Sequence, residues 1–233
     1  MTIRNLEYMF KPRSIAVVGC GKQASSTDTV VEFNLIEGGF KGPVMPVNPD
    51  RQSVSGVLAY KDIASLPVVP ELAILTTSLD KAPDLIGELG ARGTRAVLLL
   101  SREVLQDHRG DQPALLSQEI TRKYQDQGES LKQKILESAK PYLLRVMGPD
   151  HFGYAVPSAN VNASLNATRP LSGNIALLCQ SAAITRSVID WATGRNIGFS
   201  HVISVGMRWD VDLGDLLDYL LRDGSTRPHQ PDH

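Results

Sequence analysis

Residues 14–49 read SIAVVGCGKQASSTDTVVEFNLIEGGFKGPVMPVNP, and this stretch decides the fold of the N-terminal part of the chain. It opens with an apolar, β-branched run at residues 14–18, which predicts a fully buried strand. A helical pattern follows, up to the glycine pair at 38–39, and residues 42–49 predict a second strand that ends in a turn. The order strand, glycine turn, helix, strand is typical of a βαβ unit.

The turn between the first strand and the helix carries the pattern G-x-G-x-x-A at residues 19–24. Gly19 permits a sharp turn, and Gly21 lets a pyrophosphate approach the backbone. The unpaired N–H groups at the start of the helix would point at such an anion, and the polar residues 25–28 can cap the helix. An ordinary tight turn is the alternative, but the position between a strand and a helix favours nucleotide binding.

The end of the second strand indicates which nucleotide is bound. A nicotinamide dinucleotide usually requires an acidic residue there, because its carboxylate holds a ribose hydroxyl. Here the strand ends in Val47-Asn48-Pro49, and Asp50 follows only after the proline. An amide flanked by proline fits a different nucleotide better, so an NAD-dependent oxidoreductase is the weaker alternative.

Further apolar runs at residues 72–77 and 96–100 are separated by a helical pattern over residues 79–89. Continuous apolar strands that alternate with helices are typical of a parallel sheet covered on both faces, and ligands bind outside the carboxyl ends of such strands. The predicted fold class is therefore α/β, with a Rossmann-like parallel-sheet domain first. Its predicted ligand-binding residues are Gly19, Cys20, Gly21, Lys22, Ser25, Val47, Asn48, Pro49, Thr76 and Thr77.

The composition excludes several classes of function. The chain has 233 residues and is 42% hydrophobic, which supports a substantial core, and its net charge of −1 gives no reason to expect nucleic-acid or membrane binding. No apolar run approaches the roughly 20 residues that span a bilayer, and residues 1–6 lack a signal-peptide core. Cys20 and Cys179 are too few for a disulfide framework, so the cytoplasm is the expected location, and both are expected to be small buried side chains.

Residues 102–140 are charged and rich in glutamine, and their spacing predicts one or two surface helices that break near Gly128. Residues 142–147 predict another strand. Residues 154–172 show little periodicity, and we interpret them as a linker. The predicted first domain therefore ends near residue 150.

The C-terminal part of the chain predicts a second, smaller α/β domain over residues 151–224 and a disordered tail over residues 225–233. Apolar runs at 174–178 and 200–205 predict strands, and helices are expected over 182–193 and 215–221. Asp210, Asp212 and Asp215 at the start of the last helix indicate capping rather than a magnesium site. A candidate phosphate loop follows the first of these strands, because N–H groups at a helix start face outward. It consists of Gln180, Ser181 and Ala182.

The order of several short motifs carries a resemblance to a known family. The motifs are PRSIAVVG at 12–19, GGFKG at 38–42, PVNP at 46–49, GP at 148–149, QSAA at 180–183, DWA at 190–192 and DLLDYL at 215–220. In this order they resemble the N-terminal part of NDP-forming acyl-CoA synthetases, which are relatives of the succinyl-CoA ligase α subunit. Within that family the chain looks most similar to Pat-type bacterial protein lysine acetyltransferases, on residues 42–47, 56–60, 62–67 and 180–183.

The resemblance implies that the first domain binds coenzyme A or acetyl-CoA. It also implies that the second is a flavodoxin-like, succinyl-CoA ligase-like domain with helix N-termini that face phosphate. The family usually has asparagine where Asp150 stands and glycine where Ala182 stands, so we expect phosphate binding at the second domain to be weak. The family's phosphohistidine, ATP-grasp and acetyltransferase segments lie beyond the matched residues, so the chain looks like a fragment or a shortened reading frame.

The expected function is a CoA- or acyl-CoA-binding module that is not catalytic alone, with an ATP-grasp subunit or domain encoded elsewhere as a candidate partner. The alternatives are an NAD-dependent oxidoreductase and a regulatory protein that keeps the fold without the ligand. The sequence predicts no catalytic residue and, since the histidines lack ligand spacing, no metal site. It leaves a homo-oligomer open.

Overall fold

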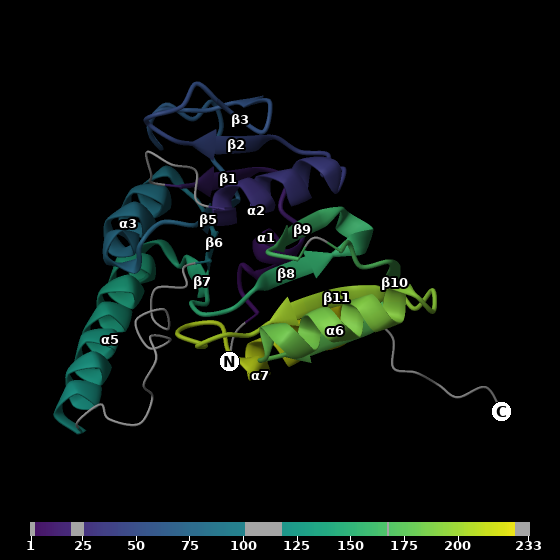
Figure 1. Cartoon of the computed structure of the whole chain (residues 1–233). Helices are drawn as coiled ribbons and strands as arrows, with labels where there is room; N and C mark the ends of the chain where they lie inside the picture. The colour runs from purple at the N-terminus through teal and green to yellow at the C-terminus, as the bar shows by residue number, and fades with distance from the viewer. Residues whose placement is uncertain (1–2, 20–25, 101–117, 167, 227–233) are drawn as a thin grey trace.

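The computed structural model describes residues 3–19, 26–100, 118–166 and 168–226, which form two main sheets and the helices that cover them (Figure 1). The α/β class predicted from the sequence is confirmed, with a five-stranded parallel sheet first and a smaller sheet after it. Within the described residues, we find no helix that combines the length and the apolar character needed to cross a bilayer.

The first sheet contains five parallel strands in the order β2-β1-β5-β6-β7. Every residue of β1, β5 and β6 is buried, because helices cover both faces of the sheet. The strands are β1 (Ile15–Val18), β2 (Val44–Val47), β5 (Leu72–Leu75), β6 (Ala96–Leu99) and β7 (Arg145–Met147).

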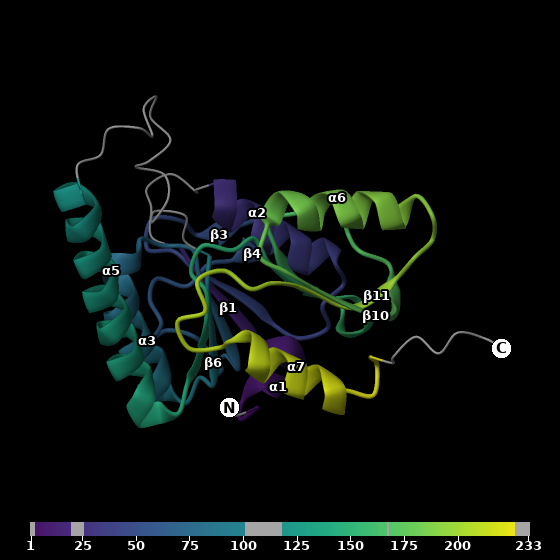
Figure 2. The ribbon, with the colours of Figure 1, turned by 90° about the horizontal axis from the view of Figure 1, so that it is seen from below.

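Successive residues of a strand point to opposite faces of the sheet, and each face has its own helices. On one face the odd-numbered residues of β1 pack in a cluster with α1 (Leu6–Phe10) and α2 (Ser26–Glu37). On the other face the even-numbered residues pack with α3 (Ala82–Arg92) and α5 (Gln118–Ala139), which lie side by side in Figures 1 and 2. Short 3-10 helices are η1 (Leu79–Lys81), η2 (Lys140–Tyr142) and η3 (Pro157–Ala159).

Helix α5 corrects one prediction, because it runs through Gly128 without a break. A glycine inside a helix costs about 1 kcal/mol relative to alanine. Packing offsets this cost, since Ile135 and Ala139 at the end of α5 are buried in the cluster that contains α3. The predicted break therefore gave too much weight to one residue's propensity. Residues 102–117 lie outside the described part of the chain.

A hairpin of β3 (Ser53–Val54) and β4 (Val57–Leu58) follows β2. Its two turn residues, Ser55 and Gly56, have φ of 48° and 79°, and positive φ at both positions is typical of a two-residue hairpin turn. The segment after the hairpin, residues 61–65, contains turns and bends.

The second sheet has the strand order β10-β11-β8-β9. Strands β10 and β11 are parallel and joined by α6, whereas β8 pairs antiparallel with both β11 and β9. Figure 2 shows α6 and α7 on opposite faces of this sheet. The elements are β8 (Gly153–Val156), β9 (Val161–Ser164), β10 (Ser172–Cys179), α6 (Ala182–Thr193), β11 (Phe199–Ser204) and α7 (Leu213–Arg222).

The prediction of a linker over residues 154–172 was wrong, because this segment contains β9 and most of β8. All residues of both strands are buried, including Asn162 and Ser164 of β9, so the polar residues that suggested a linker lie in the interior of the fold. The buried polar groups are satisfied by one another. Ser164 Oγ donates to Asn162 Oδ1 at 2.7 Å, and Asn34 Nδ2 of α2 donates to the Ser164 carbonyl at 2.8 Å.

An aromatic cluster joins α1 to the second sheet. The Phe10 ring lies 5.1 Å from Tyr154 of β8 and 5.0 Å from Tyr219 of α7, measured between ring centroids. His201 of β11 meets Phe10 edge-on at 5.7 Å. Burial lowers the pKa of His201 to about 4, so the imidazole is neutral near pH 7 and behaves as a core aromatic. The two sheets therefore share one hydrophobic cluster through α1.

Arg145 of β7, in the first sheet, forms ion pairs with two carboxylates near the start of α7, which packs on the second sheet. Its Nε donates to Asp210 Oδ2 at 2.8 Å, and its Nη2 donates to Asp215 Oδ2 at 2.6 Å. Asp210 also accepts from the Val146 N–H at 2.8 Å. Asp212 caps α7 by accepting from the Asp215 N–H at 2.8 Å, which confirms the capping predicted for this cluster. The guanidinium therefore fixes the start of α7 against the last strand of the first sheet.

We predict that Arg145→Met lowers the free energy of unfolding by about 3–5 kcal/mol. Removing one partner of a buried ion pair leaves the other charge buried without a counter-charge. Equilibrium urea denaturation followed by circular dichroism measures this change. The matched control is Arg222→Met, whose exposed partner Asp218 lies one turn away on α7. This control should change stability by less than about 0.5 kcal/mol. Equal midpoints for the two variants would contradict the prediction.

Candidate ligand sites at the strand ends

The first candidate site lies at the carboxyl edge of the first sheet. From β1 the chain passes to β2 on one side, and β5 then pairs with β1 on the other side. This reversal of strand order is a topological switch point, and open α/β sheets bind their ligands there. The register is in phase across the three strands, since Val18 pairs with both Val47 and Leu75.

The residues that follow these three paired positions form one row: Gly19, Asn48 and Thr76. Backbone hydrogen bonds hold the row together, from Gly19 N–H to the Val47 carbonyl at 3.3 Å and from Thr76 N–H to the Val18 carbonyl at 3.1 Å. The structure thus brings together residues that are 29 and 28 positions apart in the sequence (19 to 48, and 48 to 76). The sequence predicted all three as ligand-binding residues.

Asn48 is buried and organises the turn after β2. Its Oδ1 accepts from the Asp50 N–H at 2.9 Å, and its own N–H donates to the Tyr60 carbonyl at 2.8 Å. Pro49 and Asp50 are exposed beyond it. The row therefore contains a neutral amide at the position where a nicotinamide site would carry a carboxylate.

The two threonines after β5 direct their hydroxyl groups at the backbone. Thr76 Oγ1 donates to the Val18 carbonyl at 3.3 Å, and Thr77 Oγ1 donates to the Ser78 carbonyl at 3.1 Å. Their oxygens retain lone pairs that a ligand can use, but Thr77 is only 6% exposed. Thr76 is the more accessible of the two. Cys20, Gly21, Lys22 and Ser25 lie outside the described residues, so their contribution stays a prediction.

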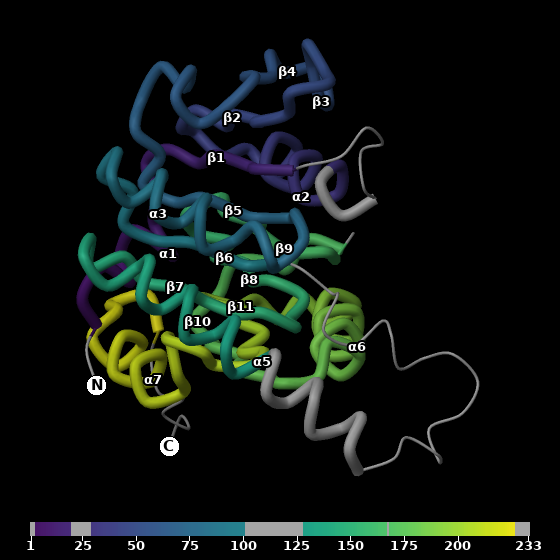
Figure 3. Tube along the Cα trace, turned by 90° about the vertical axis from the view of Figure 1, so that its left-hand side faces the viewer, coloured from purple at the N-terminus to yellow at the C-terminus, as the bar shows by residue number. Residues whose placement is uncertain are grey.

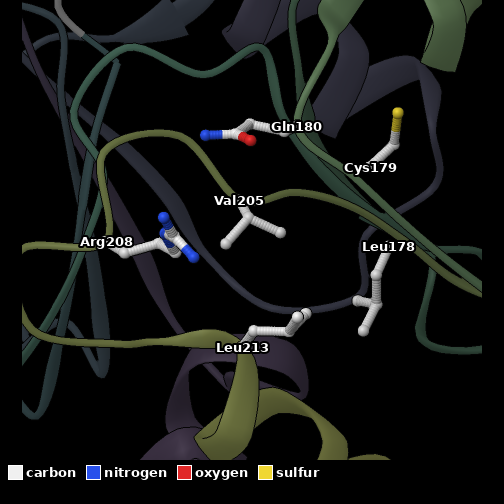
Figure 4. Close-up of a pocket in the computed structure, with 6 residues that line it drawn as sticks. All are labelled: Leu178, Cys179, Gln180, Val205, Arg208 and Leu213. Atoms are coloured by element: carbon white, nitrogen blue, oxygen red, sulfur yellow. The ribbon is translucent and has the colours of Figure 1, made fainter.

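The second candidate site is a pocket of about 130 Å³ at the carboxyl ends of β10 and β11 (Figure 4). Ser181 caps α6, since its Oγ accepts from the Ile184 N–H at 3.3 Å. Ala182 is the first residue of α6 and has no positive φ, so its Cβ fits without strain. Alanine at position 182, in place of the glycine usual in the resembling family, therefore gives no steric reason for weak phosphate binding. The pocket is lined by Leu178, Cys179, Gln180, Val205, Arg208 and Leu213.

Arg208 is the pocket residue that sequence reasoning missed. Its side chain and that of Gln180 both extend over the pocket in Figure 4, so the site has one cationic and one amide group. Arg208 stands in a turn with φ of 45°, and no motif in the sequence marks it. The loop that carries Asp150 does reach the end of β11, because the Met207 N–H donates to the Pro149 carbonyl at 2.8 Å.

Other titratable and reactive groups serve the fold. His151 is buried, its Nδ1 accepts from the Gly153 N–H at 2.9 Å, and burial lowers its pKa to about 4. Cys179 is a free thiol that is partly buried beside the pocket and donates to the Ser181 carbonyl at 3.5 Å. In the part of the chain that the structure describes, no three His, Cys, Asp or Glu side chains gather as a metal site would require.

Two family models match the chain, in the same order as its two sheets. Residues 13–157 match a CoA binding domain, and residues 172–229 match a succinyl-CoA ligase like flavodoxin domain. The first match contains the whole Gly19–Asn48–Thr76 row, and the second contains the Arg208 pocket.

The chain is also similar to curated CoA ligases. It is 29% identical over 227 residues to the ADP-forming acetate–CoA ligase I subunit alpha of Pyrococcus furiosus, which covers 96% of this chain and 46% of that protein. It is 28% identical to the ADP-forming acetate–CoA ligase of Methanocaldococcus jannaschii, over 95% of this chain and 29% of that protein. The chain therefore spans less than half the length of these relatives.

A solved structure gives the same relationship in three dimensions. The dinucleotide forming acetyl-coenzyme A synthetase 1 of Ca. Korarchaeum cryptofilum, in complex with phosphate and ADP, superimposes with a TM-score of 0.78 and 31% identity. The superposition covers 95% of this chain and 44% of that one. Both sheets of the present structure thus have counterparts in one solved protein.

We predict that the Arg208 pocket binds inorganic phosphate only in the millimolar range, since a dissociation constant of 1 mM corresponds to about −4.1 kcal/mol and the pocket offers one exposed arginine. NMR titration of the Ser181 and Ala182 amides measures the affinity. Arg208→Ala should weaken binding several-fold. The control Arg195→Ala, just beyond the C-terminal end of α6 and stacked on Trp191, should not weaken it. Saturation at micromolar phosphate would contradict the expectation.

Proposed function

Because the chain belongs to the CoA binding domain family, we propose that it binds coenzyme A or acetyl-CoA at the carboxyl edge of the first sheet. The observation that carries this proposal is the in-phase row of Gly19, Asn48 and Thr76 at the switch point of strand order. In the proposed complex the pyrophosphate meets the glycine turn at residues 19–24. The N-terminus of α2 then faces the anion, and its dipole favours negative charge there.

The row supports CoA over a nicotinamide dinucleotide. A carboxylate after β2 would hold a ribose diol, but it would also repel the phosphates of CoA. Asn48 is neutral, and its Oδ1 is already engaged with the Asp50 N–H. An NAD-dependent oxidoreductase is therefore the weaker candidate.

We propose further that the chain is a binding module of an NDP-forming acyl-CoA synthetase and is not catalytic alone. The shared fold and the family match at residues 172–229 support the ligase assignment. In this proposal an ATP-grasp subunit or domain on another polypeptide supplies the nucleotide chemistry. The narrower likeness to Pat-type protein acetyltransferases remains a proposal that rests on the motifs at residues 42–47, 56–60, 62–67 and 180–183.

We predict that calorimetric titration detects binding of CoA and acetyl-CoA but not of NAD. Gly21→Val should weaken CoA binding at least about tenfold, or ~1.4 kcal/mol, because a side chain would stand where the pyrophosphate approaches the backbone. The matched control is Gly87→Val on α3, where an added Cβ meets no atom within 4 Å. A Gly21→Val variant that folds normally and binds CoA with unchanged affinity would show that the CoA site lies elsewhere. No binding of CoA by the wild type would favour a regulatory protein.

We also predict that the purified chain makes no acetyl-CoA from acetate, CoA and ATP or GTP. The reason is that, in this proposal, an ATP-grasp subunit or domain on another polypeptide supplies the nucleotide chemistry. Among the described residues, no three His, Cys, Asp or Glu side chains gather to hold a metal ion. A coupled assay for CoA consumption measures turnover. Steady turnover by the chain without an added protein would overturn the proposal that it is not catalytic alone.

A further inference from the structure

Two histidines are buried where the two sheets of the protein meet. The sequence contains five histidines, and the described residues include His151 and His201. His201 is 0% exposed and His151 is 6% exposed. Both ring nitrogens of His201 and the Nε2 of His151 make no hydrogen bond within the described residues. Protonation would add a charge and a second N–H donor to each ring, and burial makes both costly.

His201 stands in the contact between α1 and the second sheet. Helix α1 lies between the two sheets in Figures 1 and 3 and packs in the hydrophobic cluster that they share. The His201 ring meets the Phe10 ring of α1 edge-on and lies 6.0 Å from the Tyr219 ring of α7, measured between centroids. Phe10 also contacts Tyr154 of β8. Separation of α1 from the second sheet would therefore expose His201 to water.

The charged groups around His201 do not compensate for its burial. Its Nδ1 lies 3.9 Å from Asp223 Oδ2, but Lys11 of α1 already pairs with the same carboxylate at 2.5 Å. Tyr219 donates its hydroxyl to Glu7 Oε2 at 3.3 Å and offers the imidazole no charge. Desolvation is the largest effect, and Lys11 adds to it against the opposite effect of Asp223, so the pKa of His201 is lowered to about 4.

His151 lies in the loop that connects the two sheets, between β7 and β8. Its side chain reaches the end of the first sheet, because a Cβ on Gly148 would stand 2.5 Å from its Nε2 and 2.7 Å from the Leu99 carbonyl oxygen. The adjacent charged residue in the loop is Asp150. The carbonyls of Met147 and Leu99 favour the imidazolium, but burial outweighs them and lowers the pKa of His151 to about 4.

We propose that mild acid loosens the contact between the second sheet and the first, because both histidines take up a proton only when that contact opens. A histidine in water titrates near a pKa of about 6.5, so between roughly pH 6.5 and 4 the open form binds protons that the closed form excludes. Each histidine then raises the opening constant by up to about tenfold per pH unit. Residues 3–19, 26–100 and 118–147 contain no histidine, so the effect is directed at this contact and leaves the first sheet folded.

Each sheet keeps a hydrophobic cluster of its own when the contact opens. The even-numbered residues of the first sheet pack with α3 and α5, whereas Phe152 and Phe199 of the second domain pack with Ile189 of α6. The ion pairs of Arg145 oppose the separation, so acid weakens the contact and urea completes its opening. Trp209 reports this step, because it follows β11 in the chain, is 9% exposed and packs in the cluster that contains α3.

The test is urea denaturation of a Trp191→Phe protein, in which Trp209 is the single remaining tryptophan. At pH 7 the Trp209 fluorescence and the far-UV circular dichroism should change at the same urea concentration. At about pH 4.5 the fluorescence should change at a lower urea concentration than the circular dichroism. Between pH 6.5 and 4.5 the opening constant should rise roughly a thousandfold, to which each histidine contributes a factor of about 40.

His201→Phe in the same background keeps an aromatic ring in the cluster but cannot take up a proton. It should therefore reduce the rise in the opening constant by a factor of about 40. The matched control is Tyr154→Phe, which removes a hydroxyl that donates to the Met9 carbonyl in the same cluster. This control should shift the urea midpoints but leave their pH dependence as it is with Tyr154 in place.

NMR titration of the imidazole C–H signals in the wild type gives a second measurement that requires no variant. The rings of His151 and His201 should both remain neutral down to about pH 4.5 in the folded protein. Protonation of either ring near pH 6.5 without opening would overturn the proposal. Coincident urea transitions at pH 4.5, or a His201→Phe variant with an unchanged pH dependence, would overturn it as well.

Discussion

The pairing of Arg145 with Asp210 and Asp215 is the interaction on which the arrangement of the two sheets depends. One guanidinium on the last strand of the first sheet holds the carboxylate of Asp210, which lies between β11 and α7, and that of Asp215, in the first turn of α7. A buried arginine is costly without partners, and these two carboxylates accept from it in a fixed planar geometry. The same contact sets where α7 begins, because Asp212 caps the helix between them.

From this anchor the rest of the second domain follows by packing. The segment between the end of β11 and Asp210 contains Val205 and Arg208, which line the pocket opposite Gln180. Phe10, Tyr154, His201 and Tyr219 then fill the space between α1 and the second sheet. The ion pair fixes position at one end of this interface, and the aromatic cluster excludes water from the middle. The shape of the pocket therefore depends on contacts that lie outside it.

The two candidate sites differ in how firmly the fold defines them. The first rests on strand register, which is rigid, since a one-residue shift would move every buried side chain of β1 to the other face. Gly19, Asn48 and Thr76 can hardly be separated without unfolding the sheet. The second rests on a cap and a turn, with Arg208 on an exposed loop. This difference supports the proposals of precise recognition at the first site and of weak anion binding at the second.

The sequence alone determined the parallel sheet, the order of its strands along the chain, and the row at their ends, because continuous apolar runs and a glycine turn report local burial and backbone freedom. It could not reveal β8 and β9, since both are buried on all sides and their polar residues Asn162 and Ser164 are satisfied by partners such as Asn34, far away in the chain. It could not reveal that α5 continues through Gly128, because packing on α3 outweighs one unfavourable propensity. Only the tertiary structure placed Arg208 over the pocket. Its position is a consequence of contacts between distant segments, which no local pattern encodes.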